Sequence, residues 1–183
     1  LLLAMILSAA EFGVYATMIS LFATAALFGE GGLASATTVF VARRSSQEAG
    51  NWQSALYASA FLAAAVGVAI SLAALAFSAP LAALTLGSGA LSGLLMPAAA
   101  YIPGAALSSV LLGAIQGLQR YHLLAWIGVS SGTAHLSVLV AAAVMFRSAE
   151  VALWAFALNA WIRVFVATVL LVPWLRHDKK PKH

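Results

Sequence analysis

A stretch of the chain from Ala49 to Gln119 contains no aspartate, glutamate, lysine or arginine. A helix that crosses a bilayer needs about 20 consecutive apolar residues, so this stretch alone has room for two membrane spans. Of the 183 residues, 63% are hydrophobic and 8% are charged. Soluble domains carry roughly 25% charged residues. The composition therefore excludes a soluble enzyme and indicates an integral membrane protein.

Glycine-rich and polar breaks divide the chain into apolar segments of membrane-spanning length. Their residues do not alternate between apolar and polar as the strands of a membrane barrel do. The predicted fold is all-α, a polytopic transmembrane helix bundle made of the tail of one helix and five full spans. We expect this bundle over residues 1–175 and a basic cytoplasmic tail over residues 176–183. The helix tail covers residues 1–10, and the full spans cover about residues 12–42, 52–78, 91–117, 123–146 and 151–175.

Glycine and proline predict local irregularities inside these spans. Three of the four residues from Gly29 to Gly32 are glycines, each of which weakens a helix by up to about 1 kcal/mol, so we expect a kink or break there. Pro97 and Pro103 each remove a backbone hydrogen bond, which predicts a bend in that span. Residues 79–90 form an uncharged connector. Three Gly-x-x-x-Gly pairs would let helices approach closely, namely Gly89/Gly93, Gly113/Gly117 and Gly128/Gly132.

Basic residues are distributed very unequally between the two sides of the predicted bundle. One side has only Arg147 in its loops, and the positive-inside rule therefore makes the other side cytoplasmic. We expect a multi-pass protein of the inner or plasma membrane, with loops 43–53 and 118–122 and the C-terminal tail in the cytoplasm. The basic residues on that side are Arg43, Arg44, Arg120, Arg176, Lys179, Lys180 and Lys182.

Arg163 is the remaining basic residue, and it lies in the middle of the last span. A charge there costs about 2.5 to 3.5 kcal/mol on insertion scales, so its side chain should face a cavity, a partner or water. Asn159 lies one turn earlier on the same helix face. Two interpretations are open: a structural ion pair, or an anchor for an anionic head group, because a guanidinium binds phosphate through two hydrogen bonds.

Glu30 lies at the same predicted depth as Arg163. Each charge precedes a basic residue at the cytoplasmic end, Arg43 or Arg176, by 13 residues, which is a rise of about 20 Å along a helix. Opposite charges at equal depth should pair or share one polar cavity, since isolated charges in lipid are costly. Glu30 is thus either a salt-bridge partner or a proton-coupling group. His135, also in mid-span, is either a structural neutral histidine or a proton relay.

Other polar residues are candidates for simpler roles. Glu11 falls at a helix start, where a carboxylate complements the helix dipole, so we expect it to act as a cap. Gln116, Gln119 and Arg120 either anchor the cytoplasmic end of a span or contact a substrate that enters from the cytoplasm. The chain has no cysteine and no His-Glu-x-x-His pattern, so neither a metal site nor a cofactor is indicated. We assign no catalytic residue.

Three stretches together resemble the polysaccharide and O-antigen flippases of the multidrug/oligosaccharidyl-lipid/polysaccharide exporter superfamily. Ser8–Ala16 is similar to the connection between that family's first two helices. Gly29–Ala36, leading to Val41–Arg44, is similar to its second helix, and Gly113–Tyr121 to its turn between helices four and five. Family members have two six-helix lobes around a central cavity. The resemblance implies that this chain is most of the first lobe, without most of the first helix or the second lobe.

The resemblance implies a function that needs no enzyme chemistry: translocation of a lipid-linked oligosaccharide from the cytoplasmic to the outer leaflet. The implied partners are membrane lipid, this substrate, the first helix and the second lobe, with no role for nucleic acid. One alternative is a cation-coupled drug or metabolite antiporter, whose cavity would be acidic rather than basic. Others are a membrane-embedded glycan polymerase or acyltransferase and a non-catalytic scaffold. The expected substrate contacts are Arg163, Asn159, Glu30, Gln116, Gln119 and Arg120, and the expected proton-coupling groups are Glu30 and His135.

The predicted orientation can be tested with single cysteines, because the chain has none of its own. In intact cells, an impermeant thiol reagent should label Ser88→Cys from outside and leave Lys179→Cys unlabelled until the membrane is permeabilised. Labelling of Lys179→Cys from outside would refute the orientation.

Overall fold

The computed structural model describes residues 6–45 and 52–177. Within these ranges the chain forms seven α-helices and one 3-10 helix, with no strand. Five segments are long and apolar enough to cross a membrane, which confirms the predicted all-α polytopic bundle. Residues 1–5 of the expected helix tail and residues 178–183 of the basic tail lie outside the described ranges. The helices are α2 (Ala9–Glu30), α3 (Leu33–Ser45), α4 (Trp52–Ala76), α5 (Ser78–Leu86), η1 (Gly89–Leu95), α6 (Met96–Gly117), α7 (Tyr121–Phe146) and α8 (Ala149–His177).

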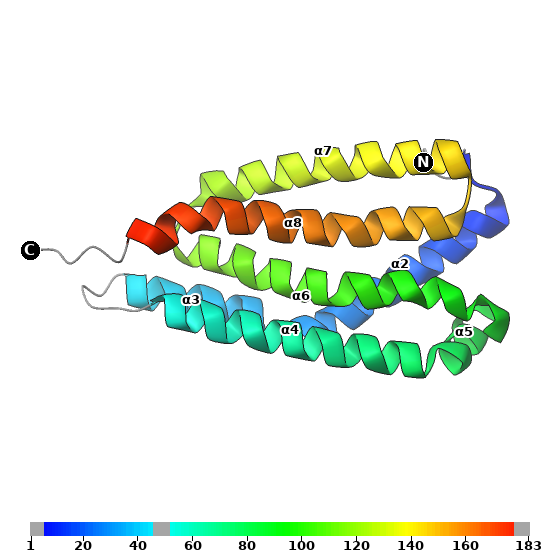
Figure 1. The fold of residues 1–183 in the computed structure, drawn as a ribbon, viewed down its shortest axis with the longest axis horizontal. Helices are drawn as coiled ribbons and strands as arrows, with labels where there is room; N and C mark the ends of the chain where they lie inside the picture. The colour runs from blue at the N-terminus through cyan, green and yellow to red at the C-terminus, as the bar shows by residue number, and fades with distance from the viewer. Residues whose placement is uncertain (1–5, 46–51, 178–183) are drawn as a thin grey trace, which may run out of the picture.

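Helix α6 lies at the centre of the bundle. It packs against α2, α3, α4 and α8, and Figure 1 shows it between the α3–α4 pair and the α7–α8 pair. Most of its side chains are small or apolar, and more than half of its residues are buried. Helix α7 is peripheral, because it packs chiefly on α8 and exposes most of its surface.

The expected break after Gly29 is confirmed. Helix α2 ends at Glu30, and α3 begins at Leu33 after two glycines in the left-handed region, Gly31 with φ of 46° and Gly32 with φ of 79°. Glycine adopts this conformation without the steric cost that a Cβ atom brings. The break leaves Glu30 at a helix end inside the bundle, rather than in the middle of a continuous helix.

One Gly-x-x-x-Gly pair brings two helix backbones together. A Cβ atom on Gly113 would lie 2.5 Å from the carbonyl oxygen of Ala34, and one on Gly117 would lie 2.7 Å from that of Thr38. The Thr38 hydroxyl also donates a hydrogen bond of 3.0 Å to the Gly113 carbonyl. Helices α3 and α6 are therefore held in direct backbone contact, which no larger residue at either glycine would permit.

Three details differ from the sequence-based expectations. The connector over residues 79–90 is largely helical, since it contains most of α5 and the start of η1. Pro97 lies in the first turn of α6, where a missing N–H costs no helical hydrogen bond, so only Pro103 lies inside that helix. The other two glycine pairs are not close helix crossings, because a Cβ on three of their members would meet no described atom within 4 Å: Gly93, Gly128 and Gly132.

Glu11 acts as a cap, but for a helix far away in the sequence. Its own helix is capped by Ser8, whose hydroxyl accepts a hydrogen bond from the Glu11 N–H at 3.2 Å. The Glu11 carboxylate accepts a 2.7 Å hydrogen bond from the backbone N–H of Ala149, the first residue of α8. A carboxylate at a helix N-terminus is favoured by the helix dipole. This contact ties the start of α2 to the start of α8.

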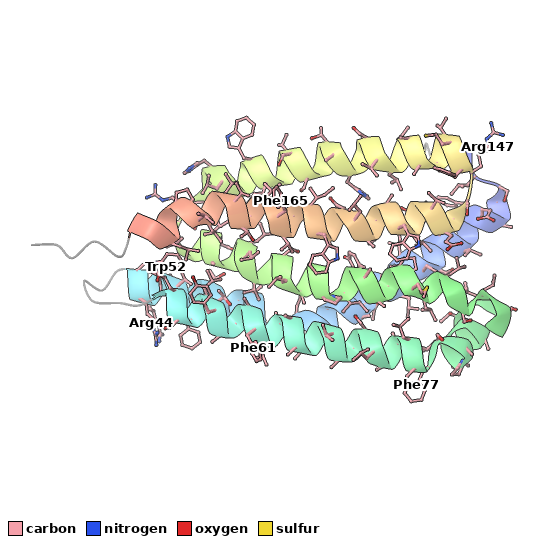
Figure 2. The ribbon with its side chains drawn as sticks, viewed as in Figure 1. Arg44, Trp52, Phe61, Phe77, Arg147 and Phe165 are labelled. Carbon is pink, nitrogen blue, oxygen red and sulfur yellow. The ribbon has the colours of Figure 1, made fainter. Side chains whose placement is uncertain are left out.

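Three arginines of the described chain lie at one end of the bundle. Arg43 and Arg44 end α3, and Arg120 lies in the α6–α7 turn at that same end. Figure 2 shows Arg44 and Arg147 at opposite ends. The charge asymmetry thus survives in three dimensions, while the side of the membrane that each end faces stays a prediction.

The tight α3–α6 contact predicts a large difference between glycines. We expect Gly113→Ala and Gly117→Ala each to destabilise the protein by about 1 to 3 kcal/mol through overpacking. Gly128→Ala on α7 is the matched control, because its methyl group enters open space and alanine favours a helix. Thermal unfolding of the purified protein in detergent, followed by circular dichroism, measures the effect. Equal melting temperatures for all three variants would contradict the close contact.

The cap on α8 gives a second prediction. Glu11→Ala should lower the free energy of unfolding by about 0.5 to 2 kcal/mol, the usual cost of losing a helix cap. Glu11→Gln keeps an acceptor oxygen and should lose less. Glu150→Ala, which removes an exposed carboxylate from the first turn of α8, serves as the control in the same melting experiment. A loss for Glu150→Ala equal to that for Glu11→Ala would contradict the specific cap.

Candidate functional site

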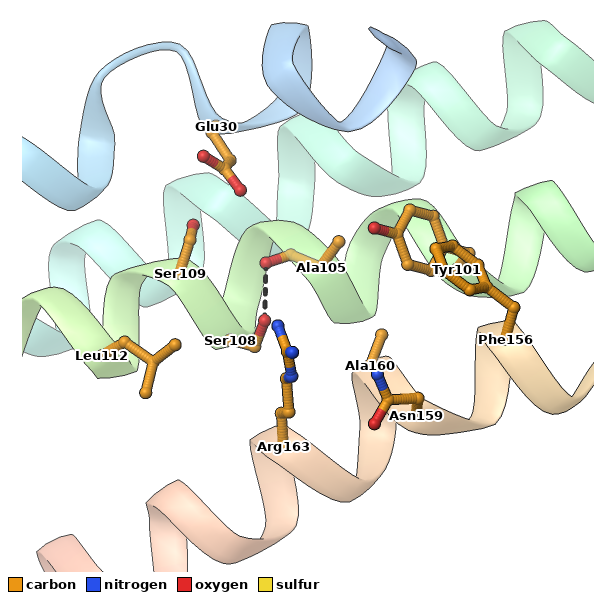
Figure 3. A pocket seen from close by; sticks show the side chains of 10 residues that line it. All are labelled: Glu30, Tyr101, Ala105, Ser108, Ser109, Leu112, Phe156, Asn159, Ala160 and Arg163. Carbon is orange, nitrogen blue, oxygen red and sulfur yellow. Dashed lines mark hydrogen bonds between the residues drawn. The ribbon is translucent and has the colours of Figure 1, made fainter. Parts of the chain in front are cut away.

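A cavity of about 250 Å³ lies inside the bundle between α2, α6 and α8. Figure 3 shows its lining side chains, which include both mid-span charges. Its walls combine these charges with two serines, an asparagine, two aromatic rings and small apolar residues. The lining residues are Glu30, Tyr101, Ala105, Ser108, Ser109, Leu112, Phe156, Asn159, Ala160 and Arg163.

Arg163 enters the cavity from α8. Its side chain is half-buried and points towards Ser108 of α6 (Figure 3). The Ser108 hydroxyl donates a 2.9 Å hydrogen bond to the Ala105 carbonyl within its own helix. Among the described residues, no hydrogen-bond or ion-pair partner of the Arg163 guanidinium is present. Its five N–H donors are therefore available to a ligand in the cavity.

Glu30 enters the cavity from the end of α2. The Ser109 hydroxyl of α6, which donates a 2.9 Å hydrogen bond to the Ala106 carbonyl of its own helix, lines the same cavity (Figure 3). As their equal depth in the sequence predicts, Glu30 and Arg163 share one cavity. They do not pair directly, because no ion pair of 4.0 Å or less joins them in the described part of the chain.

Four aromatic rings form a row at the end of the cavity away from Leu112. The ring centres of Tyr101 and Phe156 lie 4.8 Å apart, and both residues line the cavity. Phe22 extends the row on the side of α2, at 6.2 Å from Tyr101, and His135 extends it on the side of α7, at 5.6 Å from Phe156. The row crosses α2, α6, α8 and α7, so the cavity has one wall that is mainly apolar.

The structure separates the residues that the sequence had grouped as substrate contacts. Arg163, Asn159 and Glu30 line the cavity. Gln116 and Gln119 are exposed at the basic end of the bundle, and Gln119 lies in the α6–α7 turn with φ of 58°. Neither they nor Arg120 line the cavity. A substrate that contacts both groups must therefore extend from the cavity to the basic end.

His135 also lies outside the cavity lining, although its ring contacts Phe156, which is part of it. The expected proton-coupling groups Glu30 and His135 are thus in different surroundings. Among residues 6–45 and 52–177, no three histidine, aspartate or glutamate side chains are close enough to hold a metal ion.

Sequence reasoning did not assign Ser108, Ser109, Tyr101 or Phe156 to the site. Phe156 had a usable signal, because it precedes Arg163 by seven residues and so lies on the same helix face. Tyr101 had a weaker signal, because it lies between the two prolines that predict a bend in its span. Ser108 and Ser109 had none, since their helix has small and apolar residues on every side. Only the packing of α6 between its neighbours shows which of its faces lines the cavity.

Comparison with known proteins agrees with this architecture. A family model described as polysaccharide biosynthesis protein matches residues 1–183, the entire chain. The chain belongs to the polysaccharide biosynthesis protein family. With its five membrane-length helices, this family member is a multi-pass membrane protein, and the family resemblance seen in three short stretches is confirmed. No curated protein and no solved structure matches the chain.

Proposed function

We propose that this chain forms part of a flippase that moves a lipid-linked oligosaccharide from the cytoplasmic to the outer leaflet of the cell membrane. Membership of the polysaccharide biosynthesis family supports the substrate class. The central observation is the Arg163 guanidinium, which faces a cavity inside the membrane-spanning bundle without a protein partner among the described residues.

An unpaired cation in this position needs a counter-charge. A buried charge is costly unless it is paired and hydrogen-bonded. A phosphate group supplies both the negative charge and the hydrogen-bond acceptors, because its oxygens accept two parallel hydrogen bonds from one guanidinium. Asn159 and Tyr101 are polar cavity residues that can bind further oxygens. The arrangement therefore suits the phosphate-bearing head group of a lipid carrier.

The size of the cavity limits what it holds. Pockets for drug-sized ligands occupy about 300 to 1,000 Å³, and this one measures about 250 Å³. It has room for a head group but not for an oligosaccharide and a lipid chain. Those parts of the substrate must extend beyond it, towards the membrane lipid, the first helix and the second lobe, which we include among the proposed partners.

Glu30 regulates the anion site in this proposal. When ionised, it compensates part of the Arg163 charge and repels a phosphate in the same cavity. When Glu30 is protonated, it no longer compensates the Arg163 charge or repels the phosphate, so the ligand interacts with the full positive charge of the guanidinium. Uptake and loss of a proton at Glu30 would thus change how tightly the cavity holds an anion, which is the property that coupling of transport to a proton gradient requires.

Glu30 is also the observation that favours the alternative, a cation-coupled antiporter. The cavity contains one carboxylate and one guanidinium, so its charge alone does not decide between an anionic and a cationic substrate. An enzyme that works by acid–base catalysis has less support. His135, the other candidate acid or base, does not line the cavity that contains Glu30. The proposed transport needs no covalent step, no cofactor and no catalytic residue.

Substitution of Arg163 tests the proposal. In cells that depend on the complete gene for export of a surface glycan, Arg163→Ala should strongly reduce export, and Arg163→Lys should retain more of it. Truncating one partner of a buried charge pair costs about 2 to 5 kcal/mol, which is at least a tenfold loss of affinity. Arg147→Ala is the matched control, because it removes an exposed arginine that lies outside the cavity, at the end of the bundle opposite Arg44.

Full glycan export by Arg163→Ala, at normal protein levels in the membrane, would overturn the proposal. Glu30→Gln separates the alternatives. In the flippase, it keeps the anion site and should change mainly the pH dependence of export. In a cation antiporter, it should abolish transport while Arg163→Ala is tolerated.

A further inference from the structure

Three buried polar side-chain atoms have no hydrogen-bond partner in the described part of the chain. They are the hydroxyl oxygen of Ser131, the Nδ1 atom of His135 and the Oδ1 atom of Asn159. Two belong to α7 and the third to α8, and these helices pack directly against each other. All three atoms therefore belong to one pair of neighbouring helices.

The register of the two helices brings the three side chains to the same place. The His135 ring contacts the Phe156 ring at 5.6 Å and lies beside the backbone of Ala155. Helices α7 and α8 are antiparallel, because the short turn after Phe146 reverses the chain (Figure 1). Ser131 lies one turn before His135 on α7, and Asn159 lies one turn after Ala155 on α8. In an antiparallel pair of helices, this spacing places Ser131 and Asn159 at the same level, one turn from the His135–Phe156 contact. We call Ser131, His135 and Asn159 the α7–α8 polar site.

These atoms are unusual in their surroundings. Ser131 is 0% exposed and Asn159 is 9% exposed. The hydroxyls of Ser130 and Thr133, close to Ser131 in the sequence, bond to carbonyls of their own helix, as hydroxyls in apolar helices commonly do. The Ser131 hydroxyl makes no such bond. A buried polar group without a partner is costly, so three at one interface indicate that something else satisfies them.

We propose that the α7–α8 polar site binds a water molecule, which links the His135 imidazole to Asn159 and so to the Glu30–Arg163 cavity. A buried water typically makes two to four hydrogen bonds. This water would donate one hydrogen to Asn159 Oδ1 and the other to His135 Nδ1, and it would accept the hydroxyl hydrogen of Ser131. Each of the three unpaired atoms then has a partner.

The charges around the site favour water over an ion. Arg163 lies one turn beyond Asn159 on α8, and its positive charge opposes a bound cation. Neither α7 nor α8 supplies a carboxylate at this level, and Glu30 approaches the cavity from α2. An anion would be repelled by the Asn159 Oδ1 atom, which is a hydrogen-bond acceptor with partial negative charge. Water needs no compensating charge and is satisfied by one donor and two acceptors.

The consequence is a polar branch from the main cavity to α7. Asn159 belongs to both places, since it lines the cavity and the helical register places it level with Ser131 of α7. His135 then exchanges with water through this branch, although it does not line the cavity itself. This inference does not depend on which substrate the cavity binds, and it goes beyond the transport proposal.

Solid-state NMR on the complete protein in lipid bilayers tests the inference. Of the four histidines in the chain, His122, His177 and His183 would be replaced by glutamine, so that ¹⁵N-histidine labelling reports only His135. We expect magnetisation to pass from water to the His135 ring nitrogens, and this signal to be lost when the sample is exchanged into ²H₂O. No transfer from water to the ring would overturn the proposal. A ring signal that shifts when sodium chloride replaces choline chloride would overturn the choice of water and indicate a cation.

Substitutions locate the water. Ser131→Ala and Asn159→Leu each remove one hydrogen-bonding partner, and we expect either to abolish or strongly weaken the transfer to His135. Ser130→Ala is the matched control, because this neighbouring hydroxyl bonds to the Ile127 carbonyl of its own helix. Transfer that survives both Ser131→Ala and Asn159→Leu would overturn the site. These signals are independent of glycan export, so failure of this inference and failure of the transport proposal are distinguishable.

Discussion

Close packing around α6 is the constraint on which the rest of this structure depends. In lipid, the hydrophobic effect gives little drive for helices to associate, so van der Waals packing and hydrogen bonds must hold them together. Gly113 and Gly117 let α3 approach α6 to backbone contact, and Gly67 of α4 does the same at Pro103, where a Cβ atom would lie 2.8 Å from the proline Cα. Small residues thus bring two helices, α3 and α4, into close contact with one central helix.

The cavity follows from this packing and from the break in α2. Because α2 stops at Glu30 and α3 continues from Leu33 against α6, the carboxylate sits at a helix end beside the middle of α6. Arg163 reaches the same space from α8. Two charges that would each be costly in lipid are thereby withdrawn into one polar cavity, with serine hydroxyls around them. The aromatic row from Phe22 to His135 separates this polar region from the end of the bundle where Glu11 caps α8.

Helix α8 connects the two polar regions of the molecule. Arg163 and Asn159, one turn apart, present a cation and an amide to the cavity, and the Asn159 Oδ1 atom is buried without a hydrogen-bond partner in the described part of the chain. Membership of the polysaccharide biosynthesis family and the unpaired guanidinium both support the proposed transport of an anionic lipid-linked glycan. In the further proposal, the α7–α8 polar site adds a branch of this cavity through which water reaches a histidine.

The sequence by itself determined the fold class, the membrane spans, the break at Gly31 and Gly32, and the shared depth of Glu30 and Arg163. These properties depend on hydropathy, backbone conformation and residue counts along single helices, which are local quantities. Only the tertiary structure decided that Glu11 caps α8, that Gly113 and Gly117 alone form a close crossing among the three glycine pairs, and that Gln116 and Gln119 lie away from the cavity. Each of these depends on which helices become neighbours and in which register, and an apolar sequence with small residues on every helix face leaves that choice to packing in three dimensions.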